Sequence, residues 1–213
     1  SYQGELSALC MKKTSSLEEK ETTGNEILVY NSEEALSDML YQKNLDTSPC
    51  GLLIKKDIVL SNPFPVGKLH EDDFTTYKYY LSAHKTIVSQ DVCYFYYQRA
   101  GSIMHVFGQA NMDELDAADN LVTFCEKHYP QLIAAAKSKK FSDYCQVLLS
   151  NKDIKTTYPE AYARICDYLD NVKFEIVRDK KCRAKNRIAA LLCIINKNLL
   201  LAAKKFAEAG TAP

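Results

Sequence analysis

Three consecutive acids, Glu71, Asp72 and Asp73, stand in the stretch Gly67–Lys78 just before a run with helical periodicity. Phe74, Tyr77 and Leu81 follow at i, i+3 and i+7, a spacing that places apolar side chains on one helical face. The sequence therefore predicts that the acids occupy the first helical turn, where free N–H groups favour negative charge. A carboxylate held there is rigidly placed and stays ionised, and a plain capped helix start is the alternative interpretation.

A second set of candidate functional residues follows the predicted helix. A strand is expected at 85–88 and an aromatic strand at 93–99, ending in Arg99 and leading into 100–104 with its Gly-Ser-Ile-Met sequence. A guanidinium can donate two bonds to neighbouring oxygens of one group. Taken alone, however, an arginine at a strand end, such as Arg99, is usually a solvated charge.

The order of these elements resembles family 2 glycosyltransferases of the bacterial cell-surface polysaccharide type. The resemblance rests on Gly-Lys-Leu-x-Glu-Asp-Asp, a helix, a strand, an aromatic strand ending in Tyr-x-Arg, and Gly-Ser-Ile-Met. It is clearest from Asn31 to Met104, and the helical tail is similar more loosely. It implies a GT-A-like fold and inverting transfer of a sugar from a nucleotide-sugar donor to a cell-surface glycan or lipid-linked acceptor.

The resemblance also implies roles for single residues. Asp72 matches the general base of the family's Glu-Asp pair, with Glu71 and Asp73 supporting it. Arg99 and Ser102 match the element that binds the donor diphosphate, and His105 could face the same group or be structural. A divalent metal, Mn or Mg, is expected in the intact enzyme, with ligands mostly outside this chain, so no metal ligand is assigned here.

The chain departs from the family in two places. The segment Cys50–Ile58 has Leu52 where the family carries lysine, which puts the donor or acceptor contact of that lysine in doubt. The N-terminal nucleotide-binding half with its Asp-x-Asp motif has no counterpart here. We therefore expect this chain alone to be inactive, with an exposed apolar patch near 50–54 and 94–96 that could support a homodimer.

The composition narrows the class of protein. Apolar residues make up 46% and charged residues 25%, which is typical of a globular domain. Lys plus Arg and Asp plus Glu number 27 each, so no global charge favours nucleic acid. Eight cysteines without a Cys-x-x-Cys pair indicate reduced core thiols, and no signal peptide is visible. We expect a cytoplasmic protein, either free in the cytoplasm or bound at the inner face of the membrane.

The remaining elements complete an α+β prediction, mainly helical, with a partial GT-A-like mixed sheet and flanking helices before a C-terminal helical bundle. In 1–110 we expect a short helix at 3–13, a polar loop at 14–25, a strand at 26–30 and a helix from Asn31 or Ser32 to Gln42. In 111–213 we expect a helical subdomain, with helices starting near Asn111, Pro130, Pro159 and Cys182. The inward face of the last helix is predicted to carry six apolar residues: Ile188, Leu191, Leu192, Ile195, Leu199 and Ala202.

A basic cluster leads into that last helix: Arg178, Lys180, Lys181, Arg183, Lys185 and Arg187. A solvated helix start is one interpretation, and contact with anionic lipid headgroups is the other. The cluster and the helical tail together support an alternative function, a non-catalytic interaction or membrane-docking module. The stretch 188–203 is too short and too interrupted to span a bilayer.

Overall fold

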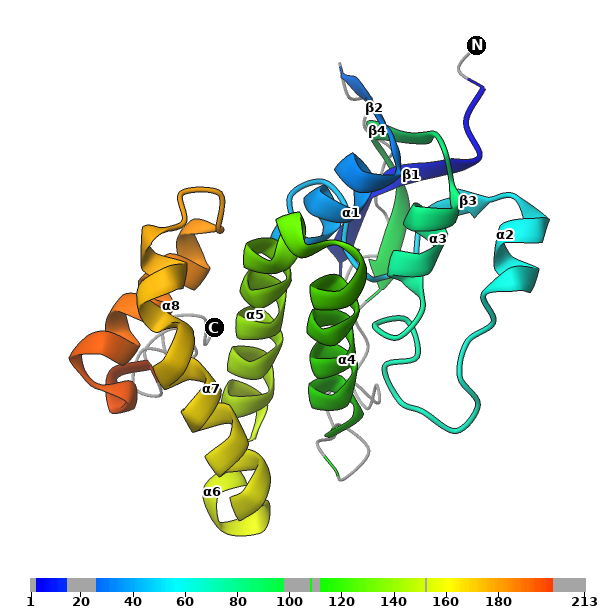
Figure 1. The fold of residues 1–213 in the computed structure, drawn as a ribbon. Coiled ribbons are helices and arrows are strands. Elements are labelled where there is room, and N and C mark those ends of the chain that lie inside the picture. The colour runs from blue at the N-terminus through cyan, green and yellow to red at the C-terminus, as the bar shows by residue number, and fades with distance from the viewer. Residues whose placement is uncertain (1–2, 15–25, 98–107, 109–111, 152, 201–213) are drawn as a thin grey trace. The chain divides into compact units, whose positions relative to one another are not determined.

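The structure is a computed structural model that describes residues 3–14, 26–97, 108, 112–151 and 153–200 (Figure 1). Contacts divide it into two compact units, Ser1–Ala110 and Asn111–Pro213. The predicted α+β class is confirmed, because the first unit holds a mixed sheet with helices and the second holds helices. The division falls where the sequence changes from mixed to helical periodicity.

The sheet of the first unit has four strands within the described residues: β1 (Leu6–Thr14), β2 (Ile27–Tyr30), β3 (Leu52–Ile54) and β4 (Thr86–Tyr97). Their order is β2-β4-β1-β3. The central strands β1 and β4 are parallel, whereas β3 and β2 add antiparallel edges to β1 and β4. The strand predicted at 26–30 is thus confirmed. The two strands predicted at 85–88 and 93–99 belong to one strand, β4, as far as Tyr97, and residues 98 and 99 lie outside the described residues.

The helix predicted at 3–13 is wrong, because this segment contains the central strand β1. Leu6 and Ala8 are buried on one face of β1, whereas Leu9, on the other face, is exposed. This alternation with a period of two residues is that of a strand. Leu6 lies beside Thr86 of β4 and Ile54 of β3 in the register. Pairing on both sides satisfies the backbone groups of β1 and outweighs its weak helical pattern.

Three helices belong to the first unit: α1 (Ser32–Tyr41), α2 (Lys56–Ser61) and α3 (Thr76–Ser82). The prediction for α1 is confirmed. Asn31 accepts from the N–H of Glu34, and Glu34 accepts from the N–H of Asn31, which makes a capping box. Helix α1 packs on α3, and Tyr30 at the end of β2 donates to Asp38 of α1 at 2.9 Å.

The opposite face of the sheet carries exposed apolar side chains. In the register Leu53 pairs with Ser7, Ser7 pairs with Ile87, and Ile87 pairs with Val29, so these four residues lie on one face of the sheet. Tyr30 and Thr86, which are their neighbours in the chain, lie on the other face. Leu53 is 76% exposed, and Leu9, Ile27 and Val29 are exposed as well. Strand β3 is therefore an exposed edge strand.

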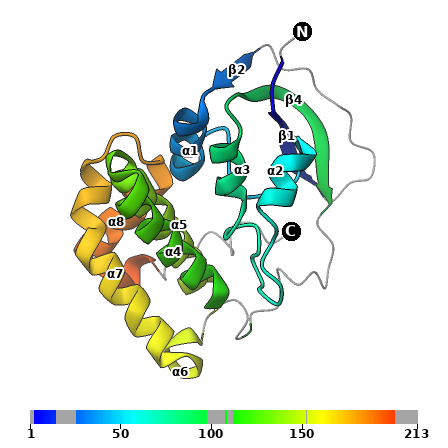
Figure 2. The same cartoon turned by 45° about the vertical axis from the view of Figure 1, so that its right-hand side comes forward.

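The second unit is built from helices, as predicted: α4 (Asp113–His128), the 3₁₀ turn η3 (Pro130–Leu132), α5 (Ile133–Ser150), α6 (Ile154–Thr157), α7 (Pro159–Arg178) and α8 (Ala184–Ile195). Helix α5 packs on α4 and α7, and α8 packs on α7 (Figure 2). Pro130 and Pro159 stand at the first positions of their elements, where a missing N–H costs nothing. The expected Asn111 cap lies outside the described residues, and Met112 precedes the first helical residue.

Asp119 of α4 joins three helices of this unit. Its carboxylate accepts from Tyr144 of α5 at 2.7 Å, pairs with Lys140 of α5 at 2.6 Å and binds Arg164 of α7. Lys140 also lies over the ring of Tyr168 on α7, with its Nζ 4.0 Å from the ring centroid. Charge-assisted bonds of this kind fix the register of the helices as well as their contact.

The predicted inward face of α8 is wrong. Asn186, Ala190 and Cys193 are the buried residues of this helix, and Asn186 donates to the carbonyl of Ser138 on α5. Ile188, Leu191, Ile195 and Leu199 are exposed, Leu192 is half-buried, and Ala202 lies outside the described residues. The prediction failed because apolar residues occur on both sides of α8. The side that packs on α7 is the one with the small side chains of Ala190 and Cys193.

Two further findings concern cysteines and membranes. Of the described cysteines, Cys125, Cys145, Cys182 and Cys193 are buried free thiols, and Cys10, Cys50 and Cys166 are half-buried free thiols. Burial raises the pKa of the Cys125 thiol to about 11, so this thiol stays protonated near neutral pH. Among the helices that the structure describes, none combines the length and the apolar character needed to cross a bilayer.

Candidate functional site

The acidic stretch lies in the connector between α2 and α3. The start of this connector is held by Asn62, which donates to Ile58 of α2 and to Ser82 of α3. Further along, the ring of Phe64 packs edge-on against Tyr79 of α3, with 5.9 Å between the centroids. The chain then turns at Gly67 and His70, both of which have positive φ.

The acids do not open a helix, so this part of the prediction is wrong. Helix α3 begins at Thr76, and Glu71, Asp72 and Asp73 form turns ahead of it. The carbonyl of Asp72 accepts from the N–H groups of Thr75 and Thr76 at 3.0 and 2.9 Å. The left-handed φ of His70 and the non-helical φ of Thr75, −130°, prevent the helix from continuing upstream.

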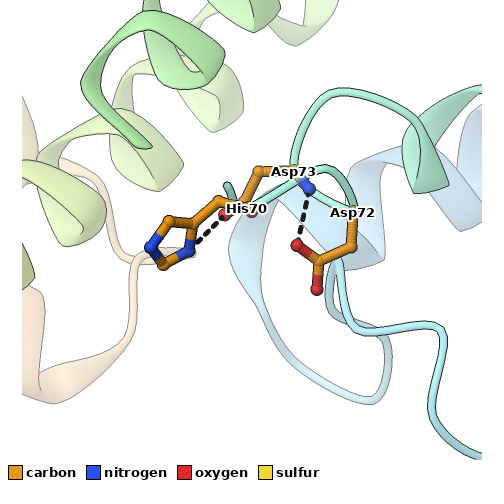
Figure 3. A group of neighbouring side chains, drawn as sticks. All are labelled: His70, Asp72 and Asp73. Atoms are coloured by element: carbon orange, nitrogen blue, oxygen red, sulfur yellow. Dashed lines mark hydrogen bonds and ion pairs between the residues drawn. The ribbon is translucent and has the colours of Figure 1, made fainter. Parts of the chain in front are cut away.

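Asp72 is held in place by the backbone of its own turn. The N–H of Asp73 donates to Oδ1 of Asp72 at 3.0 Å (Figure 3). Burial, together with the neighbouring charges of Asp73 and Glu71, raises the pKa of Asp72 from 3.8 to about 6. The backbone N–H groups of Asp73 and of Asp72 itself favour the ionised carboxylate, but burial and the neighbouring charges outweigh them.

Asp73 is anchored from two other positions. Thr47, from the segment after α1, donates its hydroxyl to Oδ1 of Asp73 at 2.6 Å. Nδ1 of His70 lies 3.8 Å from Oδ2 of Asp73, and both side chains are largely buried (Figure 3). The Asp73 charge that raises the pKa of Asp72 is therefore fixed in position by residues before and after it.

His70, Asp72 and Asp73 together offer three possible metal-ligand atoms, all within 4.8 Å of one another. The sequence analysis assigned no role to His70 or Thr47. The signal for His70 was its i,i+3 spacing to Asp73, which brings two side chains together in a turn as it does in a helix. No sequence signal points to Thr47, which lies 26 residues before Asp73.

The predicted diphosphate-binding residues, Arg99, Ser102 and His105, lie outside the described residues. Strand β4 is described as far as Tyr97, so the roles predicted for these three residues stay predictions. The structure does bring Asp72, Asp73 and the half-buried Glu71 into one turn, as their sequence positions require.

The apolar patch expected near 50–54 and 94–96 is present in part. Leu53 and Tyr94 are exposed, whereas Leu52, Ile54, Phe95 and Tyr96 are half-buried. Gly51 has φ +80° and brings its backbone against Leu9, whose N–H donates to the Gly51 carbonyl at 3.0 Å. An added Cβ at Gly51 would lie 3.1 Å from the Leu9 carbonyl oxygen, so glycine is required for this close approach.

Comparison with models of protein families gives no match for this chain, and comparison with curated proteins gives none either.

Proposed function

We propose that this chain is part of a family 2 glycosyltransferase of the cell-surface polysaccharide type, with Asp72 as the general base. The proposal combines the ordered motifs of residues 31–104 with the surroundings of Asp72. Those motifs imply transfer from a nucleotide-sugar donor to a glycan or lipid-linked acceptor.

The observation that carries the proposal is the raised pKa of Asp72, about 6, on a carboxylate that the backbone of its own turn holds in place. An ordinary aspartate is a poor base because its pKa is far below neutrality. A pKa near 6 makes the carboxylate more basic, yet about nine-tenths of it remains ionised at pH 7. The turn hydrogen bonds add the positional restraint that proton transfer needs.

The proposed step conserves atoms and charge. Oδ2 of Asp72 takes the proton from the acceptor hydroxyl while that oxygen forms a bond to the anomeric carbon. The bond from the anomeric carbon to the diphosphate oxygen breaks, and its electron pair leaves with the nucleoside diphosphate. Attack opposite to the leaving group inverts the anomeric configuration.

The divalent metal that the resemblance implies does not fit the cluster of His70, Asp72 and Asp73. Oδ1 of Asp73 already accepts from the Thr47 hydroxyl at 2.6 Å, so a metal at this carboxylate would compete with that bond. A metal bound to Asp72 would also withdraw the lone pair that the base needs. We therefore derive no step through a metal at these residues.

The test is transfer from a panel of nucleotide sugars to lipid-linked and oligosaccharide acceptors, using the protein with its natural flanking sequence. Asp72→Asn removes basicity at nearly constant shape, so kcat should fall by about 10²–10⁴ with KM little changed. Asp57→Asn, the same change at an exposed carboxylate of α2, is the matched control. Turnover retained in Asp72→Asn would reject Asp72 as the base.

A further inference from the structure

Helix α8 has two apolar faces, and among the described residues only one of them is buried. Its buried face is formed by Asn186, Ala190 and Cys193. At about 100° per residue, Ile188, Leu191 and Ile195 fall on the opposite face. These three side chains are 58%, 48% and 66% exposed. Isolated exposed apolar residues are ordinary, but an i, i+3, i+7 stripe of large ones along a helix indicates a contact surface.

Basic residues surround the start of the same helix. Residues 174–195 contain six basic and two acidic side chains, a local net charge of +4 in a chain whose overall charge is zero. Arg178, Lys180, Lys181 and Lys185 are exposed at the end of α7, in the turn and at the start of α8. The C-terminal end of α7 favours cations and accounts for Arg178, but not for the three lysines that follow it.

The turn that carries these charges is held by its own hydrogen bonds. Asp179 accepts at its Oδ1 from the N–H of Lys181 at 2.9 Å. Arg187 donates to the carbonyl of Val177 at 3.1 Å, and Arg183 donates to Ser142 of α5 at 2.7 Å. The two arginines thus tie the turn to α7 and α5, which leaves the exposed lysine positions next to the apolar stripe of α8.

We propose that the α7–α8 turn and the outward face of α8 form a surface that docks on an anionic lipid bilayer. Ile188, Leu191 and Ile195 enter the headgroup and acyl boundary, while Lys180, Lys181 and Lys185 contact headgroup phosphates. Apolar residues on one face with lysines beside them are the pattern of a helix lying in the membrane interface. Charge complementarity favours this occupant over an uncharged partner. The proposal does not depend on glycosyl transfer.

The test is flotation of the 213-residue protein with two kinds of vesicle, pure phosphatidylcholine and an equal mixture of phosphatidylcholine and phosphatidylglycerol. We expect binding to the anionic vesicles at least about tenfold tighter than to the neutral ones, and weaker in high salt. Leu191→Gln/Ile195→Gln and Lys180→Glu/Lys181→Glu should each lower binding about tenfold or more. Leu53→Gln/Val66→Gln, at exposed apolar positions of the first unit, should leave it unchanged.

All the substituted side chains are exposed, so the variants should keep the wild-type circular dichroism and thermal unfolding. Loss of binding only in the lysine variant would show a purely electrostatic surface and overturn the proposal. A dimer that Leu191→Gln/Ile195→Gln converts to monomer, without vesicle binding by the wild type, would assign the stripe to a second copy. Equal binding to both kinds of vesicle would also reject an anionic bilayer as the partner.

Discussion

Asp73 acts on Asp72 in two opposing ways. Its backbone N–H donates to Oδ1 of Asp72 at 3.0 Å and favours the ionised form, while its carboxylate repels that form. Burial adds to the repulsion and is the largest cause, so the pKa of Asp72 rises to about 6. The balance between these effects leads to two predictions about the site.

Asp72→Asn should stabilise the folded protein at pH 7.5. Because the folded-state pKa is raised above 3.8, the contribution of Asp72 to stability is complete below that pH and is lost as the pH rises through about 6. Removing the charge should raise the free energy of unfolding at pH 7.5 by about 1 kcal/mol, after allowance for solvent screening.

Urea unfolding of wild type and Asp72→Asn at pH 4 and pH 7.5 measures this difference. The gain should be small at pH 4 and absent at both values in the exposed control Asp57→Asn. A loss of stability at pH 7.5 would show that the ionised carboxylate is favoured by contacts other than those described.

Asp73→Asn should lower the pKa of Asp72. The substitution removes the neighbouring charge but keeps the backbone N–H and an oxygen that can accept from Thr47. Carbon-13 NMR titration of the Asp72 carboxyl should show a midpoint well below 6. Glu71→Gln should shift it less, because Glu71 contributes less than Asp73 to the raised pKa. A larger shift in Glu71→Gln would contradict the order of these two charges.

Asp119→Asn should destabilise the helical unit by about 2 kcal/mol at pH 7, since it weakens charge-assisted bonds from Lys140 and Arg164. Burial raises the pKa of Asp119, but the bonds from Lys140, Tyr144 and Arg164 outweigh it and the pKa is lowered. Its contribution is therefore present above 3.8 and is lost as the pH falls through the lowered value.

Thermal unfolding at pH 7 and pH 2.5 tests this dependence. The control is Asp116→Asn, which affects one exposed ion pair with Arg164 at 3.0 Å and should cost well below about 1 kcal/mol. Equal costs for the two substitutions would show that the contacts of Asp119 across three helices add nothing to stability.

Lys139→Met should be strongly destabilising. Nζ of Lys139 lies 2.7 Å from both carboxylate oxygens of Asp143, and both side chains are buried within α5. Removing the ammonium leaves a buried carboxylate without that charge partner, a change that costs about 3–5 kcal/mol. Lys139→Met/Asp143→Leu should recover most of the loss, as judged from the midpoints of urea unfolding. A double variant as unstable as the single one would contradict the charge-burial explanation.

Local signals in the sequence determined much of the helical structure. The Asn31–Glu34 capping box and the 3.6-residue pattern of Ala35, Leu36 and Met39 lie within α1 itself, so its bounds were predicted closely. Pro130 and Pro159 likewise mark element starts through their own fixed φ and missing N–H. The acids of the candidate site were also found from the sequence, because they are neighbours in the chain.

Contacts between distant segments decided the rest. β1 is a strand because β4, 80 residues further on, and β3 pair with it on both sides, and no local pattern contains that information. Which apolar face of α8 is buried depends on the surface that α7 and α5 offer it. Contacts between distant segments also produce the turn before α3, the burial of Asp72 and the bond from Thr47 to Asp73. The sequence alone determined which carboxylates stand together, whereas tertiary packing set their solvent exposure and hence the basicity of Asp72.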